Sequence, residues 1–188
     1  MIGVRFSREG DCFVLDNGAF QLKGELCEGR LVRNLICDGT DLGWLDLALT
    51  ASSDGKAGDE AGILSLADAR FAVREGVPAL DLWGDWWKKT GRWSYDGIAW
   101  RVHVRISTER ESRKFGLRVI DVFNSGAKPL RVSAIRGLAG GSRIGLSASA
   151  QKMVPEGFGT LAPGEVWTPR YPLAFSVTVK EDVYEECR

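Results

Sequence analysis

The sequence predicts an all-β protein that folds as a single antiparallel β-sandwich, of the jelly-roll or supersandwich-like kind. Three observations favour this fold class. Apolar and polar residues alternate in many short runs, which is the period of a half-buried strand. Dipeptides typical of hairpin turns, Asn17-Gly18, Asp38-Gly39 and Asp96-Gly97, lie between such runs. The 23 glycines among 188 residues suit frequent turns better than long helices.

The first 50 residues have the pattern of a β-meander, in which consecutive strands pair through tight turns. We expect strands at residues 2–6, 12–15, 19–26, 30–37 and 42–50. Residues 8–11 are predicted to form the first turn. Residues 51–62 are polar and rich in small side chains, so we expect an exposed loop there. The length suits one domain spanning residues 1–188.

The stretch from Ala79 to Phe123 is the predicted centre of the sandwich. It contains the single histidine, His103, and five of the seven tryptophans, namely Trp83, Trp86, Trp87, Trp93 and Trp100. Alternation places Asp81, Trp83 and Asp85 on one face of a strand. In the run Ile98–Ile106, His103 shares a face with Arg101 and Arg105, and Asp96-Gly97 is predicted to turn the chain before this run.

The remaining segments also favour strands. We expect Ile63–Val73 to be a strand rather than a helical turn, Phe115–Phe123 an interior strand and Leu130–Leu138 its return strand. Further strands are expected around Val166 and Trp167 and at Ala174–Val179. The glycine-rich segment 137–145 predicts a bulged or tightly packed sheet edge. It lacks the Gly-Lys-Ser/Thr and the helical pattern of a phosphate loop.

Charge and hydropathy narrow the possible partners. The 25 acidic and 25 basic residues balance, so no global field attracts DNA or RNA, and we expect no nucleic-acid partner. No apolar run reaches the roughly 18 residues of a membrane span, and we expect no membrane partner. The N-terminus shows no apolar core of a signal peptide, which predicts a cytoplasmic protein.

The cysteines predict neither a metal site nor a cofactor. Cys12, Cys27, Cys37 and Cys187 show no C-x-x-C spacing, and one histidine cannot complete a usual zinc set. We expect three buried or half-buried thiols and one thiol in the tail. A disulfide is the alternative if the source is secreted or a hyperthermophile.

Candidate ligand-binding residues gather around the tryptophans, because indoles stack on the apolar faces of sugar rings and carboxylates accept hydrogen bonds from hydroxyls. The candidates are Trp83, Asp85, Trp86, Trp87, Trp93, Asp96 and His103. Core packing is the alternative interpretation of the indoles. Trp86 and Trp87 are adjacent, so they face opposite sides of a strand, and at least one is expected outside the core.

No residue is predicted to be catalytic. Asp81 and Asp85 share a face but stand roughly 13 Å apart along a strand, which exceeds the separation of a glycosidase carboxylate pair. His103 lies among arginines, and no serine or cysteine stands in a recognisable nucleophile motif.

Two runs carry a resemblance to a known family. The run LDNGAFQLKGELCEGRLVRNLICDGTD resembles the start of galactose-mutarotase-like sandwich domains of carbohydrate-active enzymes, and IDVFNSGAKPL is similar to one of their turns. Active members use histidines and a glutamate, whereas this chain has only His103. The resemblance therefore implies a related sandwich without that activity, and no catalytic residue is carried over.

Two functions follow from these observations. The first is a non-catalytic binding or assembly module that recognises carbohydrate through a tryptophan-rich face or forms a homo-oligomer, for which a homodimer is reasonable given the balanced charge. The alternative is a carbohydrate-active hydrolase or isomerase with Asp81, Asp85, Asp96 and His103 as its polar groups.

Overall fold

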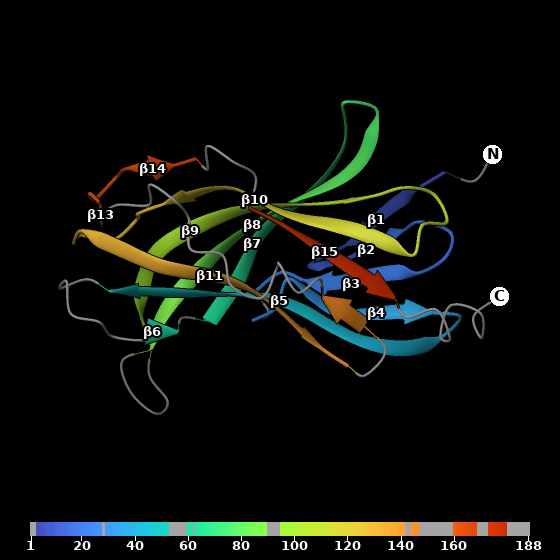
Figure 1. The fold of residues 1–188 in the computed structure, drawn as a ribbon, viewed down its shortest axis with the longest axis horizontal. Coiled ribbons are helices and arrows are strands. Elements are labelled where there is room, and N and C mark those ends of the chain that lie inside the picture. The colour runs from blue at the N-terminus through green and yellow to red at the C-terminus, as the bar shows by residue number, and fades with distance from the viewer. Residues whose placement is uncertain are drawn as a thin grey trace.

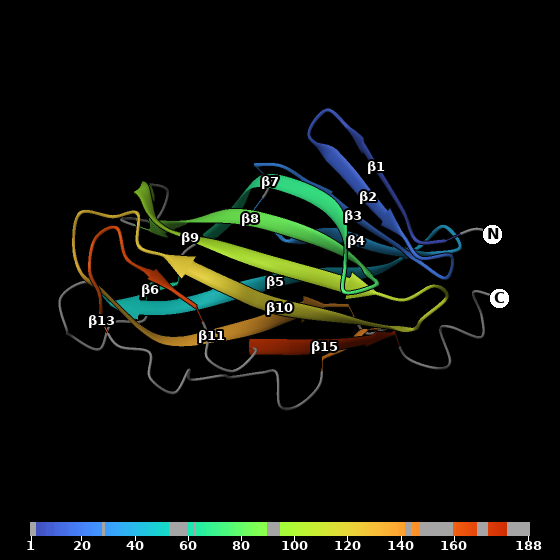
Figure 2. The same cartoon turned by 90° about the horizontal axis from the view of Figure 1, so that it is seen from above.

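The computed structural model describes residues 3–27, 29–52, 60–61, 63–89, 95–141, 144–146, 160–168 and 173–179. Every regular element within these ranges is a strand. The strands form two antiparallel sheets that pack against each other, as Figures 1 and 2 show from two directions. The all-β sandwich predicted from the sequence is therefore confirmed. The described part of the chain contains no helix long and apolar enough to span a membrane.

The first sheet begins with the predicted meander. Its strands are β1 (Arg5–Glu9), β2 (Cys12–Asp16), β3 (Gln21–Glu25), β4 (Val32–Cys37) and β5 (Thr40–Ser52). Beyond β5 the sheet continues with β11 (Leu130–Gly140) and β13 (Thr160–Leu161), while β6 (Glu60–Ala61) also pairs with β5. The turn between β4 and β5 has φ of 44° at Asp38 and 78° at Gly39, as a two-residue hairpin with two positive-φ positions requires.

The second sheet contains the long central strands. In spatial order these are β12 (Ile144–Leu146), β15 (Leu173–Val179), β10 (Lys114–Phe123), β9 (Tyr95–Thr108), β8 (Val77–Lys89) and β7 (Ile63–Arg74). A short strand, β14 (Val166–Trp167), pairs with β10. The strands predicted at 63–73, 115–123 and 174–179 are confirmed, and the second of these is interior to its sheet, as expected.

The turn predicted at Asp96-Gly97 is wrong. Asp96 lies opposite Lys88 and Ile98 lies opposite Trp87, so the dipeptide is part of β9. The register shifts at two successive steps, from Trp86 to Trp87 and from Trp87 to Lys88, because at each step β9 advances by two residues while β8 advances by one. Such a shift is a β-bulge, which glycine tolerates well. Asp96-Gly97 therefore lies within the β8–β9 ladder, beside a bulge, and does not form the turn that joins the two strands.

Other boundaries, and one strand pairing, also differ from the prediction. Residues 51–52 continue β5 and residues 60–61 form β6, so these ends of the predicted loop are strand, because their backbones join the ladder. Residues 53–59 and 62 lie outside the described residues. The first strand starts at Arg5 and includes Arg8 and Glu9, which were predicted to turn. Strand β11 does not return beside β10 but crosses to the first sheet and pairs with β5.

The core fills the space between the two sheets with alternate side chains from each strand. Trp86 and Trp100 lie opposite each other on β8 and β9 and are 0% and 3% exposed. The core interpretation therefore holds for these two indoles. Within the described ranges, neither indole Nε1 has a hydrogen-bond partner. Gly140 packs against the Trp44 ring so closely that a Cβ there would overlap it, as expected for a tightly packed glycine segment.

Buried Asn17 links the two sheets at one end through hydrogen bonds. Its side-chain amide shares its hydrogens among Thr108 Oγ1 (3.0 Å) and the carbonyl oxygens of Glu109 (3.2 Å) and Ser112 (2.9 Å). The backbone N–H of Glu111 donates to the Asn17 carbonyl oxygen at 2.7 Å. The predicted β2–β3 turn is thus present, and it is held against the turn between β9 and β10 of the other sheet.

The cysteines depart from the expected unpaired thiols. Cys37 is disulfide-bonded. Cys12 and Cys27 are free, but both are exposed rather than buried or half-buried. Cys187 lies outside the described residues. The disulfide, which the sequence left as the alternative, therefore applies to Cys37, because a favourable partner in space decides pairing and sequence spacing does not.

Candidate functional site

The candidate site lies on the outer face of strands β7 to β10. On β8, Leu80, Leu82 and Trp86 are buried in the core. Successive side chains of a strand alternate between its two faces, so Asp81, Trp83 and Asp85 belong to the outer face. The face that the sequence predicted for these three residues is confirmed.

Three cross-strand pairs form the centre of this face. Opposite-charge pairs flank an aromatic pair, so the site has an ordered charge pattern rather than a random polar surface. Directly opposed residues of this kind interact and stabilise a sheet. The three pairs are Asp81 with Arg105, Trp83 with His103, and Asp85 with Arg101.

Both outer pairs are bidentate ion pairs. Arg101 donates from Nε and Nη2 to the two Asp85 carboxylate oxygens at 2.7 and 3.2 Å. Arg105 does the same to Asp81, at 2.7 and 3.3 Å. Two parallel hydrogen bonds fix the plane of each guanidinium as well as its position. The hydrogen bonds with Asp85 raise the pKa of Arg101.

Asp81 is the most enclosed charge of the site, with a side chain only 1% exposed. Arg74 from β7 adds a third hydrogen bond to it at 3.2 Å. Burial by itself raises the pKa of Asp81, but the hydrogen bonds and charge of Arg105, with Arg74, outweigh it and hold the pKa below the ordinary value. The carboxyl group is therefore ionised at neutral pH and has no proton to donate.

His103 connects the pairs across the sheet. Its ring stacks on the Trp83 indole, with centroids 4.5 Å apart and planes 15° apart. Nδ1 lies 3.4 Å from an oxygen of Asp121 on β10. Nε2 lies 3.3 Å from Asp81 Oδ1, yet it is buried and makes no well-aligned hydrogen bond. On β7, the Arg70 guanidinium carbon lies 5.3 Å from the Trp83 ring centroid.

The sequence candidates divide into three groups. Trp83, Asp85 and His103 are brought together on this face. Trp86 is not part of the site, because its strand parity points it into the core, where it is 0% exposed. Trp93 lies outside the described residues, as do the side chains of Trp87 and Asp96, whose backbones belong to β8 and β9.

The arginines and aspartates that complete the face were not among the predicted site residues, although Arg101 and Arg105 were predicted to share a face with His103. These are Asp68, Arg70, Arg74, Arg101, Arg105 and Asp121. Their alternation along each strand was visible in the sequence. Their partners were not, because an ion pair between neighbouring strands depends on the register in which the strands pair.

The described residues contain no group of three or more histidine, cysteine, aspartate or glutamate side chains that could hold a metal ion. No protein-family model and no curated protein matches this chain. The resemblance to galactose-mutarotase-like domains therefore stays a prediction.

Proposed function

We propose that this protein is a non-catalytic binding module that recognises carbohydrate on the outer face of β7 to β10. The observation that carries the proposal is the stacked pair of Trp83 and His103, held between two bidentate Arg–Asp pairs. The arrangement is a rigid surface with an aromatic centre and polar flanks. Rigid polar groups that need no reordering on binding favour recognition of a polar ligand.

The hydrogen-bonding character of the face suits a ligand rich in hydroxyl groups. Each sugar hydroxyl both donates and accepts, and this surface presents arginine donors beside carboxylate acceptors. The side chains of Arg74 and Arg101 are 54% and 48% exposed, so part of each guanidinium remains available to a ligand. The paired charges leave no large excess of either sign, which favours a neutral sugar over a polyanion.

Arg70 controls access to the indole. Its side chain is 73% exposed and lies over the Trp83 ring, while His103 stacks on the same ring from the neighbouring strand. An exposed cation–π contact is worth only about 0.5–1 kcal/mol, so a sugar ring can displace Arg70 at small cost. We infer that Arg70 covers the ring in the free protein and moves aside when a ligand stacks there.

The carboxylates favour binding over hydrolysis. Glycosidic-bond cleavage requires one carboxyl group that carries a proton. Asp81 and Asp85 are both engaged by arginines, and the pKa of Asp81 is lowered. The enzyme alternative would need Asp96 or His103 to supply the proton instead.

The distribution of exposed apolar side chains favours ligand binding over assembly into a homo-oligomer. Among the described residues, the exposed large apolar side chains are Val73, Val77, Leu138 and Val166, which belong to different parts of the fold apart from the first two. They do not gather on the candidate face. The predicted homodimer remains a prediction that light scattering can test.

The test is a titration of the protein with a panel of neutral oligosaccharides, followed by tryptophan fluorescence and by amide chemical shifts. We expect the W83A variant to lose binding and the R70A variant to bind more tightly. W44F is the matched control, because Trp44 lies on the other sheet beneath Arg30, at 4.3 Å. Equal losses in W83A and W44F would contradict the proposal, and release of cleaved sugar would favour the enzyme.

A further inference from the structure

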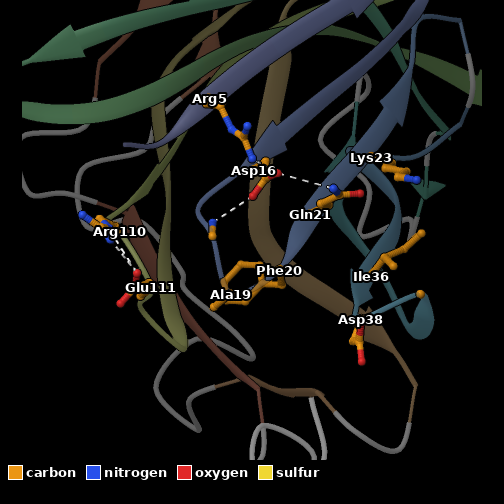
Figure 3. Close-up of a pocket in the computed structure, with 12 residues that line it drawn as sticks. Arg5, Asp16, Ala19, Phe20, Gln21, Lys23, Ile36, Asp38, Arg110 and Glu111 are labelled. Atoms are coloured by element: carbon orange, nitrogen blue, oxygen red, sulfur yellow. Dashed lines mark hydrogen bonds and ion pairs between the residues drawn. The ribbon is translucent and has the colours of Figure 1, made fainter. Parts of the chain in front are cut away.

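A cleft lies on the first sheet, apart from the candidate face of β7 to β10 (Figure 3). Its volume is about 630 Å³, within the roughly 300–1,000 Å³ of small-molecule sites. Strands β3 and β4 and the turn between β4 and β5 form one side, and the turn between β9 and β10 contributes Arg110 and Glu111 on the other. Segments from both sheets therefore enclose it.

The two sides are fixed relative to each other. Asn17 donates three side-chain hydrogen bonds to the end of β9 and the β9–β10 turn, and the Glu111 N–H donates back to the Asn17 carbonyl oxygen. Asp16 accepts a hydrogen bond from the Gly18 N–H at 2.8 Å, which orders the neighbouring turn. The cleft is preformed, so little ordering opposes binding.

Most charges at the cleft are paired within the protein. Asp16 accepts hydrogen bonds from Arg5 at 3.2 Å and from Gln21 at 3.4 Å. Arg110 donates from Nε and Nη2 to one Glu111 oxygen at 3.1 and 2.9 Å. These groups satisfy one another and leave the cleft without a net charge from them.

Lys23 and Asp38 are the exceptions. Both line the cleft, and neither side chain has a hydrogen-bond or ion-pair partner among the residues that the structure describes. One cation and one anion are therefore available to a ligand. An anionic ligand would satisfy only the lysine and a cationic ligand only the aspartate, whereas a ligand with both charges satisfies the two.

The backbone positions of Lys23 and Asp38 along the sheet set the length of the ligand. Lys23 lies opposite Asn34 in the β3–β4 ladder, and Asp38 follows four positions later. Four residues of strand span about 13 Å. Figure 3 shows the Ile36 side chain between Lys23 and Asp38, so the path between the charges is partly apolar. An amino acid is too short to bridge them.

We propose that this cleft binds a short peptide through both of its free termini. The terminal ammonium binds the Asp38 carboxylate, and the terminal carboxylate binds the Lys23 ammonium. An extended tripeptide spans about 10 Å. With a charge-assisted hydrogen bond of about 2.8 Å at each end it reaches about 16 Å, which is enough to bridge the roughly 13 Å between the two positions. The central side chain then lies over Ile36.

The test uses the peptide glycyl-leucyl-glycine and the isotope-labelled full chain. We expect the peptide to shift the amide signals of Gly18, Lys23 and Gly39, which belong to residues that line the cleft. Acetylation of the peptide N-terminus and amidation of its C-terminus should each weaken binding up to about fivefold, the effect of one exposed ion pair.

Two variants assign the termini. D38N keeps a residue type that tolerates the positive φ of 44° at this position, and we expect it to bind free and acetylated peptide equally. K23Q should bind free and amidated peptide equally. D11N and K128Q change exposed residues away from the cleft and are the controls. Two results would overturn the proposal. Acetylation could weaken binding to D38N, or amidation binding to K23Q, as much as they weaken binding to the unmodified protein. Alternatively, the free peptide could shift no amide signal of the residues that line the cleft.

This inference does not depend on the carbohydrate site. Lys23 and Asp38 belong to the first sheet and its turn, whereas Trp83 belongs to the second. The W83A variant should bind the peptide with the affinity of the unmodified protein. The K23Q variant should likewise bind sugar with the affinity of the unmodified protein. Failure of one proposal is therefore distinguishable from failure of the other.

Discussion

The Trp83 indole and the His103 imidazole stack almost parallel, at 15°, with ring centroids 4.5 Å apart. The two residues lie directly opposite each other in the β8–β9 ladder. The stack is therefore a consequence of strand register, and a slip of one residue would remove it together with the Arg–Asp pairs on either side. The organisation of the whole face depends on this register.

Loss of the stack should be measurable in the unliganded protein. H103A is expected to lower the free energy of unfolding by about 1 kcal/mol, the typical contribution of an aromatic pair, and to change tryptophan fluorescence. Urea unfolding with fluorescence detection measures both. H103F keeps a ring against Trp83 and should retain most of the stability. If H103A and H103F lowered the free energy of unfolding equally, stacking on Trp83 would not be the source of the stability that His103 contributes.

Asp81 should dominate the response to acid. Because its pKa in the folded state is lowered, its contribution to stability is present above the ordinary aspartate pKa and is lost as the pH falls through the folded value. D81N should lower the free energy of unfolding at pH 7 by about 2–3 kcal/mol, somewhat below a fully buried pair because its arginines are partly exposed.

The matched control is D68N, since the Asp68 side chain is 30% exposed and also binds arginines. That exposed pairing should contribute less than about 1 kcal/mol. The acid limb of the stability curve, measured by urea unfolding between pH 2 and pH 5, should flatten in D81N. An unchanged limb in D81N would contradict this assignment.

Asp46 should make the stability of the protein fall as the pH rises, which is the opposite of the effect of Asp81 and occurs at higher pH. Burial raises the pKa of Asp46 from 3.8 to about 7, while hydrogen bonds from the Leu47 and Leu31 backbones and the charge of Arg30 oppose the rise. The folded protein then holds a proton that the unfolded chain releases, so stability falls as the pH rises from about 4 to about 7.

The D46N variant removes this titration. It is expected to be more stable than the unmodified protein at pH 8, by on the order of 2–4 kcal/mol, and to differ little at pH 4.5. Urea unfolding at the two pH values measures the difference. A D46N variant less stable than the unmodified protein at pH 8 would show that the carboxylate is accommodated without such a penalty.

Asn17 should be the most sensitive polar position of the fold. N17A removes the amide that donates to Thr108 and Ser112 and accepts from the backbone N–H of Phe20, so it leaves buried and part-buried polar groups without that partner, which should lower the free energy of unfolding by about 2–4 kcal/mol. Faster hydrogen exchange of the Glu111 amide would locate the change. N34A, which removes a surface hydrogen bond to Asp41, is the control and should lower it by less than about 1 kcal/mol.

Local alternation was enough to predict much of the architecture. The period of two grouped Asp81, Trp83 and Asp85 on one face of their strand and Arg101, His103 and Arg105 on one face of theirs. The structure confirms both groups and places them on the same outer face of the sheet. The reason is that strand geometry sends side chains to alternate sides whatever the partner strand is. The hairpin turn at Asp38-Gly39 was predictable for a similar reason, because its residues accept positive φ locally.

The tertiary structure decided which strands meet and therefore which side chains meet. Pairing of β11 with β5 and the bulge at Asp96-Gly97 depend on contacts between distant segments. The same holds for the choice of Trp86 for the core, the disulfide of Cys37 and the partners of Asp81. Alternation within a strand divides its side chains between two faces. Only the packing of one sheet against the other determines which face is buried and in which register neighbouring strands align.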